Sequence, residues 1–245
     1  MRLLFIRHAE PDYVHDSLTE KGFREAKFLG EYLKNESIDE IYVSPLGRAQ
    51  ETMKAYLRES GTKVVPVTKD WLREFDAKVK HDHNDGCAWD FLPETIEAMD
   101  EDIFSSDPNK VNQANPCYQN SNYLERYNRA INGLDEILKE NGYVREGRHY
   151  KVEQENTKTI AFFCHFGVIS VLTSHLFNTS SMVVGQYFCA LPSSITTLFS
   201  EERRKGIASF RCVEFGATPH LAIHHEAPSF SARFSETYSD PRRHD

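Results

Sequence analysis

Four short apolar runs along the chain predict buried β-strands, because polar or turn-forming residues follow each of them. These runs cover residues 2–6, 40–44, 63–67 and 159–163. Four other segments place apolar residues three or four positions apart, which is the spacing of an amphipathic helix. They cover residues 17–36, 46–60, 123–142 and 167–177. Strands that alternate with helices predict a parallel sheet covered by helices on both faces.

The first helical segment shows the helix pattern together with a start signal. Its apolar face would consist of Phe23, Ala26, Leu29 and Leu33. Thr19 alone, or Ser17 together with Glu20, supplies an N-cap signal before this face begins. We therefore expect a helix that begins near residue 20 and buries those four side chains.

The last part of the chain follows a different pattern. Residues 193–202 and 207–216 contain β-branched and aromatic residues that alternate with polar ones. This alternation favours an antiparallel hairpin with residues 201–206 as its turn. The predicted fold class is therefore α/β: a three-layer α/β/α sandwich with a mostly parallel sheet and a C-terminal antiparallel hairpin.

Residues 77–121 interrupt the alternation of strands and helices. A helix is expected near residues 92–104, with its apolar side chains facing the core and its acids facing outward. A turn-rich stretch follows this helix. We interpret residues 77–121 as an inserted cap over the sheet edge, within a single domain of residues 1–245.

Chemically capable side chains follow all four predicted strands. Arg7 and His8 come after the first strand, and His165 comes after the fourth. Arg48 opens the helix behind the second strand, and Glu74 lies a few residues after the third. Ligands of open α/β sheets bind outside the carboxyl ends of the parallel strands. We therefore expect these five side chains to meet at one edge of the sheet.

The five side chains together favour phosphoryl chemistry. Two guanidinium groups are suited to bidentate recognition of phosphate, and a helix N-terminus beside Arg48 also favours an anion. Two histidines add a nucleophile or a proton carrier near neutral pH. The carboxyl group of Glu74, or that of Asp76 two residues later, could protonate a leaving group.

Five motifs, in order along the chain, resemble those of the histidine phosphatase superfamily, the phosphoglycerate-mutase-like fold. They are IRHAEPDY (6–13), LTEKG (18–22), SPLGRAQET (44–52), LREFD (72–76) and FFCHFGVI (162–169). The chain looks most like the branch of small-molecule phosphatases that includes alpha-ribazole phosphatase and broad-specificity enzymes. The resemblance covers residues 1–76 and, roughly, 122–215.

The resemblance implies a phosphomonoesterase that hydrolyses a small phosphorylated metabolite through a phosphohistidine intermediate. His8 would attack phosphorus. Arg7, Arg48 and His165 would hold the phosphoryl oxygens. Glu74 would protonate the departing alcohol and then activate water. No metal ion or other cofactor is implied, since two guanidinium groups and an imidazolium can neutralise the developing charge.

Three other functions remain open. Phosphoglycerate-mutase-type transfer is disfavoured, because Pro11 and Val14 stand where mutase-type members have phosphate-binding Thr or Ser and Asn. A metal-dependent hydrolase could use the HDHND cluster of residues 81–85, with further ligands from elsewhere in the chain. A catalytically inactive phosphate-binding protein of the same fold is the third, although all five chemical positions hold competent residues.

Charge and cysteine content narrow the partners and the compartment. A net charge of -8 at pH 7 speaks against binding of nucleic acid. The five cysteines contain no CxxC pair and indicate free thiols in a reducing compartment. No stretch approaches the roughly 20 apolar residues of a membrane span. We therefore expect a cytoplasmic protein with a small phosphorylated substrate and neither nucleic acid nor membrane as a partner.

Residues 81–107 contain nine Asp or Glu and no Lys or Arg. If this segment caps the phosphate site, its acids would form a negative rim that disfavours polyanions. Monophosphates of neutral or amine-bearing alcohols would then be preferred over bisphosphates. Trp89 and Phe91 of the same segment are candidates to line the substrate pocket.

Overall fold

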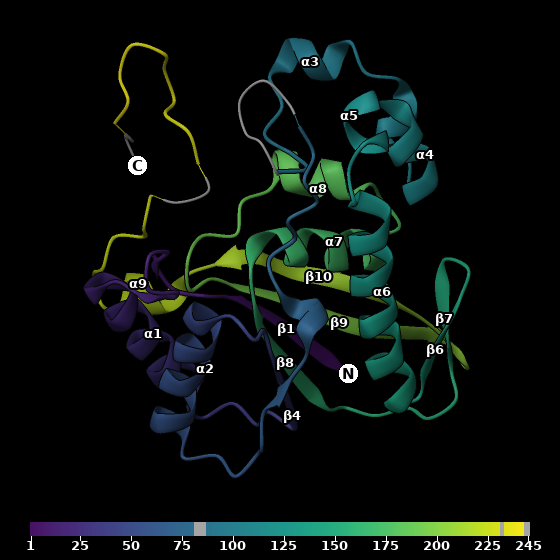
Figure 1. Ribbon diagram of the computed structural model, residues 1–245. Coiled ribbons are helices and arrows are strands. Elements are labelled where there is room, and N and C mark those ends of the chain that lie inside the picture. Colours follow the sequence, from purple (N-terminus) through teal and green to yellow (C-terminus); the bar gives the residue numbers. More distant parts are fainter. Residues whose placement is uncertain (81–86, 231–232, 243–245) are drawn as a thin grey trace.

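The computed structural model describes residues 1–80, 87–230 and 233–242. In this part of the chain, one eight-stranded sheet has the order β5-β4-β8-β1-β9-β10-β7-β6 (Figure 1). Its strands are β1 (Arg2–Arg7), β4 (Glu40–Val43), β5 (Val67–Thr68), β6 (Tyr143–Glu146), β7 (His149–Val152), β8 (Thr159–Cys164), β9 (Ile195–Arg204) and β10 (Ile207–Ala217). A separate two-stranded ribbon consists of β2 (Pro11–Asp12) and β3 (Ser17–Leu18).

Helices cover both faces of the large sheet, which confirms the predicted three-layer arrangement (Figure 1). The main ones are α1 (Glu20–Leu33), α2 (Gly47–Ser60), α6 (Tyr123–Glu140) and α7 (Phe166–Phe177). Successive side chains of β1 point to opposite faces. Ile6 packs in one core cluster with Leu29 of α1, and Phe5 packs in the other with Leu134 of α6.

The register of the central strands brings their ends to one edge. β1 is parallel to β8, with Arg7 paired to Cys164, and β4 is parallel to β8 on its other side. The three strands therefore end together. Their next residues, His8, Ser44 and His165, follow at the same edge of the sheet.

The sheet is parallel on one side of β1 and antiparallel on the other. β5, β4, β8 and β1 are parallel neighbours, whereas β9 pairs antiparallel with β1 and with β10. The β9–β10 pair confirms the predicted C-terminal hairpin. A second hairpin, β6–β7, extends this antiparallel half. Its strands have four residues each and are largely half-buried or exposed. They therefore lack the apolar pattern from which a strand could be predicted.

The third predicted strand is much shorter than expected. Residues 63–67 read as a buried strand, but β5 contains only Val67 and Thr68, and both are exposed. Pro66 has no N–H to donate to a ladder, and the Val65 side chain is 80% exposed. The prediction was wrong here because an apolar edge segment resembles a buried strand in sequence.

The first helix begins as predicted but buries a different face at its start. The Thr19 hydroxyl accepts from the Gly22 N–H at 3.0 Å and caps α1. Phe23 was expected inside, yet it is 43% exposed, while Glu25 is fully buried. The rest of the predicted face is buried as expected: Ala26, Leu29 and Leu33.

Residues 87–121 form several short helices instead of one longer one. They are α3 (Pro93–Glu97), η2 (Glu101–Phe104), α4 (Pro108–Ala114) and α5 (Pro116–Gln119). Ile103 and Val111 join the same core cluster as α6. Asp100 and Glu101 are exposed, as expected for acids on the outer face of this segment. Figure 1 shows these helices beyond the sheet edge, near α8 (Ser181–Tyr187).

The C-terminal segment returns to the end of β1. After α9 (Pro219–Ile223), the Ser229 hydroxyl lies between the carboxyl groups of Glu10 and Glu25, with 2.6 Å to Glu25. Burial raises the pKa of Glu25. The Ser229 contacts join the C-terminal segment to α1 and to the segment that follows β1.

Candidate active site

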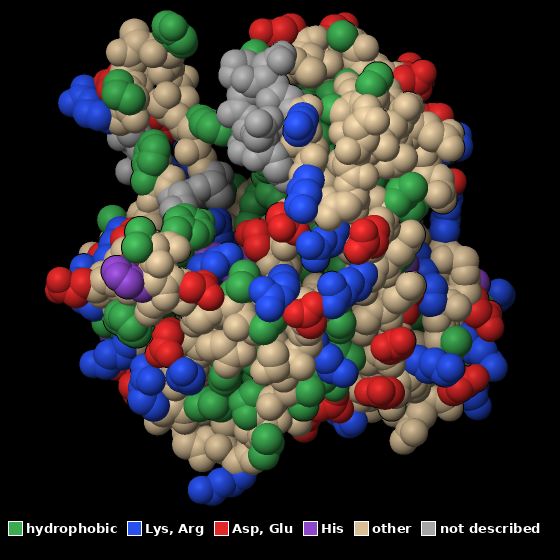
Figure 2. Space-filling view, in the orientation of Figure 1, with side chains coloured by type: hydrophobic (Ala, Val, Ile, Leu, Met, Phe, Trp, Pro, Cys, Tyr) green, Lys and Arg blue, Asp and Glu red, His purple; other side chains and the backbone are tan. Residues whose placement is uncertain are grey.

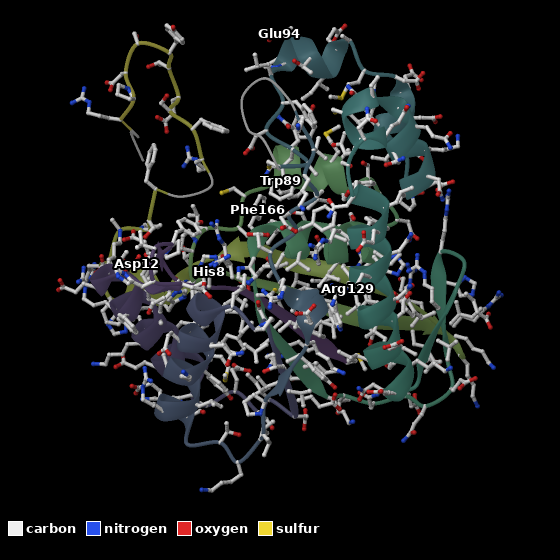
Figure 3. The ribbon with its side chains drawn as sticks, viewed as in Figure 1. His8, Asp12, Trp89, Glu94, Arg129 and Phe166 are labelled. Carbon is white, nitrogen blue, oxygen red and sulfur yellow. The ribbon has the colours of Figure 1, made fainter. Side chains whose placement is uncertain are left out.

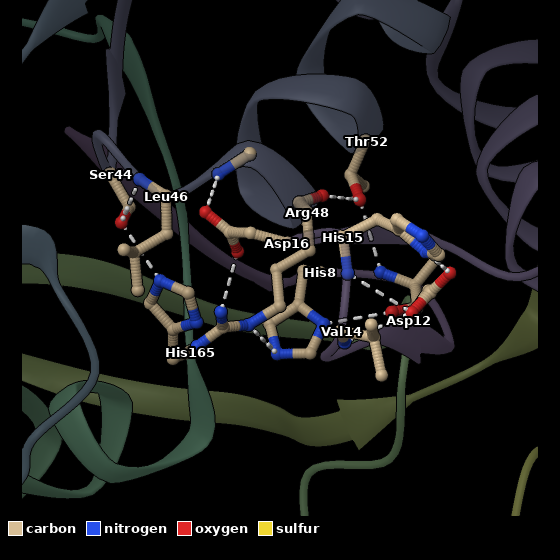
Figure 4. Close-up of polar contacts among 12 residues, drawn as sticks. His8, Asp12, Val14, His15, Asp16, Ser44, Leu46, Arg48, Thr52 and His165 are labelled. Atoms are coloured by element: carbon tan, nitrogen blue, oxygen red, sulfur yellow. Dashed lines mark hydrogen bonds and ion pairs between the residues drawn. The ribbon is translucent and has the colours of Figure 1, made fainter.

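The sheet edge gathers four of the five predicted residues in a tight and buried group. His8 is 1% exposed, His165 is 0% exposed and Arg7 is 5% exposed. The rings of His8 and His165 lie 5.0 Å apart between centroids. Arg48, in the first turn of α2, places Nε 3.4 Å from Nε2 of His8 (Figure 4).

The contacts of His8 indicate which of its two ring nitrogens carries the proton in the neutral imidazole. Nδ1 lies 2.8 Å from the carbonyl oxygen of Ala9. A carbonyl oxygen can only accept, so Nδ1 carries the proton and Nε2 presents a lone pair. Burial and then the adjacent Arg7 lower the pKa of His8 well below the ordinary histidine value. The ring is therefore suited to act as a nucleophile at neutral pH.

Two buried nitrogens at this edge have no hydrogen-bond partner in the part of the chain that the structure describes. They are Nε of Arg7 and Nδ1 of His165. The remaining contacts hold both side chains in place: Arg7 donates to the Ala190 carbonyl at 2.7 Å, and His165 Nε2 lies 2.8 Å from Ser44 Oγ. An unpaired buried N–H such as that of Arg7 Nε is costly, so a bound anion would stabilise this edge.

The surroundings of His165 oppose the positive charge that the sequence suggested. Burial, followed by the neighbouring His8 and Arg48, lowers the pKa of His165 well below its ordinary value. A neutral imidazole can still contribute a hydrogen bond. The two arginines supply the positive charge there.

Asp16 is a site neighbour that sequence reasoning missed. Its carboxylate accepts from Arg48 Nη1 and from the Gly47 N–H, both at 2.7 Å (Figure 4). A Cβ at Gly47 would lie 2.0 Å from the Asp16 carbonyl oxygen, so glycine is required there. Asp16 thus fixes Arg48 and the start of α2. Its position before LTEKG gave no pattern that pointed to this role.

Glu74 and Asp76 lie in different surroundings. Oε1 of Glu74 accepts from the Gly167 N–H at 3.0 Å and from the Phe75 N–H at 2.8 Å, so the carboxyl group lies at the start of α7 beside His165. The exposed Asp76 pairs with Arg126 at 3.3 Å. The placement favours Glu74 as the acid.

Two cavities meet at Glu74. The first, of about 380 Å³, is called the aromatic cleft, and its lining includes Trp89, Phe166, Tyr187, Phe188 and Phe234 together with Arg7 and Glu74. The second, of about 540 Å³, is called the arginine recess, and its lining includes Arg48, Arg73, Arg126 and Arg129 together with Glu74, Asp70 and Asp76. Arg7 thus borders the first space and Arg48 borders the second, and Glu74 borders both.

The two cap residues singled out in the sequence have different positions. Trp89 lines the aromatic cleft and lies above Phe166 in Figure 3. Phe91 is 3% exposed, and its ring lies 6.0 Å from that of Tyr118. Phe91 therefore belongs to the core of the 87–121 segment.

The acidic stretch faces outward. Glu94 lies farther from His8 than Trp89 does in Figure 3, and acidic side chains gather at the outer end of the molecule in Figure 2. Asp102 pairs with Lys110 at 3.1 Å. A negative rim around the phosphate site thus stays a prediction without a contact to support it.

Other sequence expectations concern metal and membrane. The HDHND cluster at residues 81–85 lies outside the described residues. Among the residues that are described, no group of three or more His, Cys, Asp or Glu side chains has a metal-binding arrangement. Of the helices within residues 1–80, 87–230 and 233–242, none has the length and apolar character of a membrane span.

Comparisons with known proteins find relatives among phosphoglycerate mutases and phosphatases. The chain is 34% identical to a 2,3-bisphosphoglycerate-dependent phosphoglycerate mutase of Treponema denticola over 113 residues, 42% of this chain and 43% of that enzyme. The chain thus spans less than half the length of this relative. It is 28% identical over 241 residues to phosphoserine phosphatase 1 of Hydrogenobacter thermophilus, covering 91% of this chain and 100% of that enzyme.

A solved structure and a family model complete the comparison. The phosphoglycerate mutase from Bacillus anthracis str. Sterne shares the fold with a TM-score of 0.61 at 17% identity, over 92% of this chain and 97% of that one. The model of the histidine phosphatase superfamily (branch 1) matches residues 3–212. This match covers well over half of the chain, including the residues that follow β1, β4 and β8. The chain therefore belongs to the histidine phosphatase superfamily.

Proposed function

We propose that the chain is a metal-independent phosphomonoesterase that hydrolyses a small phosphorylated metabolite through phospho-His8. The observation that carries this proposal is a pair of buried, unpartnered nitrogens beside a neutral nucleophile. Arg7 Nε and His165 Nδ1 lack partners among the described residues, and both lie at the edge where His8 Nε2 accepts from Arg48 Nε at 3.4 Å. A phosphoryl oxygen would accept from Arg7 Nε and, with the Ser44 hydroxyl donating to His165 Nε2, from His165 Nδ1.

The first step transfers the phosphoryl group to the enzyme. His8 Nε2 forms a bond to phosphorus while the bond from phosphorus to the alcohol oxygen breaks. Arg7, Arg48 and His165 hold the equatorial oxygens, where negative charge is spread in the transition state. Glu74 gives its proton to the departing alcohol oxygen.

The second step hydrolyses the phosphoenzyme. Glu74, now ionised, takes a proton from water, whose oxygen attacks phosphorus as the bond to His8 Nε2 breaks. Inorganic phosphate and a neutral His8 are released. Glu74 suits both steps because it borders both cavities next to the phosphoryl position.

A mutase is the second candidate, because the Treponema denticola relative bears that name. A mutase would pass the phosphoryl group from His8 to a hydroxyl group in place of water. The sequence disfavours this, since Pro11 and Val14 occupy positions that contact phosphate in mutase-type members. The Val14 side chain is 87% exposed, so it supplies no replacement contact.

The test is to trap the phosphoenzyme with labelled p-nitrophenyl phosphate in excess chelator. We expect an acid-labile, base-stable phosphoprotein in the wild type and none in His8→Ala, with turnover reduced by at least about 10⁴-fold. His15→Ala is the matched control, because His15 lies in the next loop, between β2 and β3, with a side chain that is 75% exposed. It should keep both label and turnover.

Other outcomes identify the alternatives. Turnover that chelator abolishes would favour a metal-dependent hydrolase. Binding of phosphate without turnover would favour an inactive phosphate-binding protein. Rapid transfer of the label to an added phosphoglycerate, in preference to water, would favour the mutase. His8→Ala within tenfold of wild type would overturn the proposed mechanism.

A further inference from the structure

We propose that the aromatic cleft binds the alcohol part of the substrate, and that it selects phosphate monoesters whose alcohol carries a flat apolar group. This inference rests on the proposed function and adds a substrate class to it. The cleft begins at Arg7 and Glu74, which handle the phosphoryl and leaving oxygens. An ester held there would extend its alcohol among the rings.

Trp89 is positioned in this cleft by two glycines. A Cβ at Gly167 would lie 2.5 Å from Trp89 Cη2 and 2.6 Å from Glu74 Oε1. A Cβ at Gly185 would lie 2.8 Å from Trp89 Cγ. The indole therefore packs directly on the start of α7 and on α8. This contact gives it a fixed position beside the proposed acid.

Further rings complete the walls around Trp89. Phe166 meets it edge to face, with centroids 5.6 Å apart. Tyr187 and Phe188 also line the cleft, although they are 61% and 46% exposed. Large exposed aromatics gathered at one opening mark a binding surface, and such rings pack well against flat groups.

The side-chain amide of Gln186, in the wall of the cleft, already forms hydrogen bonds within the protein. Gln186 lines the cleft, but its Oε1 accepts from the Phe91 N–H at 3.0 Å and its Nε2 donates to the Phe91 carbonyl at 3.1 Å. A sugar or polyol needs such groups to replace its bonds to water.

Two charged side chains also line the cleft, Asp90 and Arg233. Asp90 accepts from Cys87 Sγ at 3.9 Å, and Arg233 donates to Glu236 at 3.1 Å. Both therefore have partners within the protein. The cleft therefore favours a ring over a polyhydroxylated chain.

The test compares 2-phenylethyl phosphate with ethyl phosphate and glycerol 1-phosphate. We expect kcat/KM for the phenylethyl ester to exceed that for the ethyl ester by about tenfold or more, as burial of a ring between aromatics implies. Trp89→Ala and Tyr187→Ser should each reduce this ratio to about threefold or less. Tyr187 is exposed, so its variant should fold even if Trp89→Ala does not.

Two further variants sharpen the test. Gly185→Ala should displace the indole and lower the ratio without removing any ring. Phe104→Ala is the matched control, because Phe104 is a 43% exposed aromatic on η2. It should leave both the ratio and the activity unchanged.

Binding of 2-phenylethylphosphonate and ethylphosphonate, measured by calorimetry, separates this inference from the proposed function. Phosphonates cannot be hydrolysed, so a tenfold preference for the phenylethyl compound supports the cleft even if no ester is turned over. Equal or undetectable binding of the two would overturn the inference. Turnover of all three esters at similar kcat/KM, or a preference for glycerol 1-phosphate, would overturn it as well.

Discussion

The sheet edge around His8 and the walls of the two cavities are built in different ways. The edge comes from β1, β8 and β4, three parallel neighbours whose register fixes where each chain leaves the sheet. The walls come from short helices, loops and the C-terminal segment, and many of their side chains are exposed. Rigid, buried elements thus hold the reacting groups, and more exposed elements surround the rest of the substrate.

This difference separates chemistry from selectivity. Displacement of His8 would require the register of the central strands to change, which would disrupt the core on both sides. Replacement of Tyr187 or Arg129 disturbs no core contact, because both are exposed. Substitutions at the edge should therefore abolish turnover, while substitutions in the walls should change which ester is preferred.

Among the substitutions that test this difference, the largest loss of kcat/KM is expected at Glu74, which lies at the sheet edge and lines both cavities. Glu74→Gln should lower kcat/KM for an alkyl phosphate by about 10²–10⁴-fold, because an alkoxide leaves poorly without a proton. The loss for p-nitrophenyl phosphate should be much smaller, since nitrophenolate leaves without one. Steady-state kinetics on the two esters measure the difference.

Asp76→Asn is the matched control for this prediction. The exposed Asp76 pairs with Arg126, so its variant should lose less than about threefold on either ester. A larger and leaving-group-dependent loss in Asp76→Asn than in Glu74→Gln would assign the acid to Asp76. Equal losses on both esters in Glu74→Gln would remove the role from Glu74.

The sequence placed Arg7, His8 and His165 at one sheet edge because each lies next to a predicted strand in the chain. Arg7, His8 and His165 directly follow apolar strands, so knowledge of the strands places them together. Asp16 could not be found in this way. Its contact with Arg48 depends on how the loop between β2 and β3 folds back onto α2, which is a long-range feature.

The walls were harder to predict for a related reason. Trp89 and Phe91 are aromatic residues two positions apart in the same segment. Trp89 nevertheless lines the cleft, whereas Phe91 is buried. The same limit applies to the fold: an exposed apolar edge at residues 63–67 reads like a core strand, and the half-buried β6–β7 hairpin has no clear alternation. Burial, which decides each case, is set by distant parts of the chain.

A smaller effect concerns the stability of the edge as pH changes. Burial lowers the pKa of His8 below the ordinary histidine value, so the unfolded chain takes up this proton at a higher pH than the folded protein. The stability contributed by neutral His8 is complete above the unfolded pKa and is lost as pH falls through it. His8→Asn should therefore lose less Tm than wild type between about pH 7.5 and about pH 5.5.

His15→Asn provides the comparison for this measurement. His15 is largely exposed and pairs with Asp12 at 2.7 Å, so its variant measures how much a surface histidine contributes to the fall in Tm. Differential scanning calorimetry at several pH values gives each curve. An identical fall in His8→Asn and wild type would mean that His8 titrates equally in the folded and unfolded states.

The smallest effect should come from the acidic face that the sequence made prominent. Asp100, Glu101 and Asp102 belong to η2 and its cap and do not line the arginine recess. Arg126 and Arg129 line that recess beside Glu74. Exposed charges farther apart than about 8–10 Å are largely screened at physiological salt. Neutralising the three acids should thus change the bisphosphate-to-monophosphate ratio of kcat/KM by less than about twofold. Replacing both arginines with glutamine should lower that ratio more, by about three- to tenfold at low salt. A salt-sensitive gain for the bisphosphate in the acid variant alone would instead establish the negative rim.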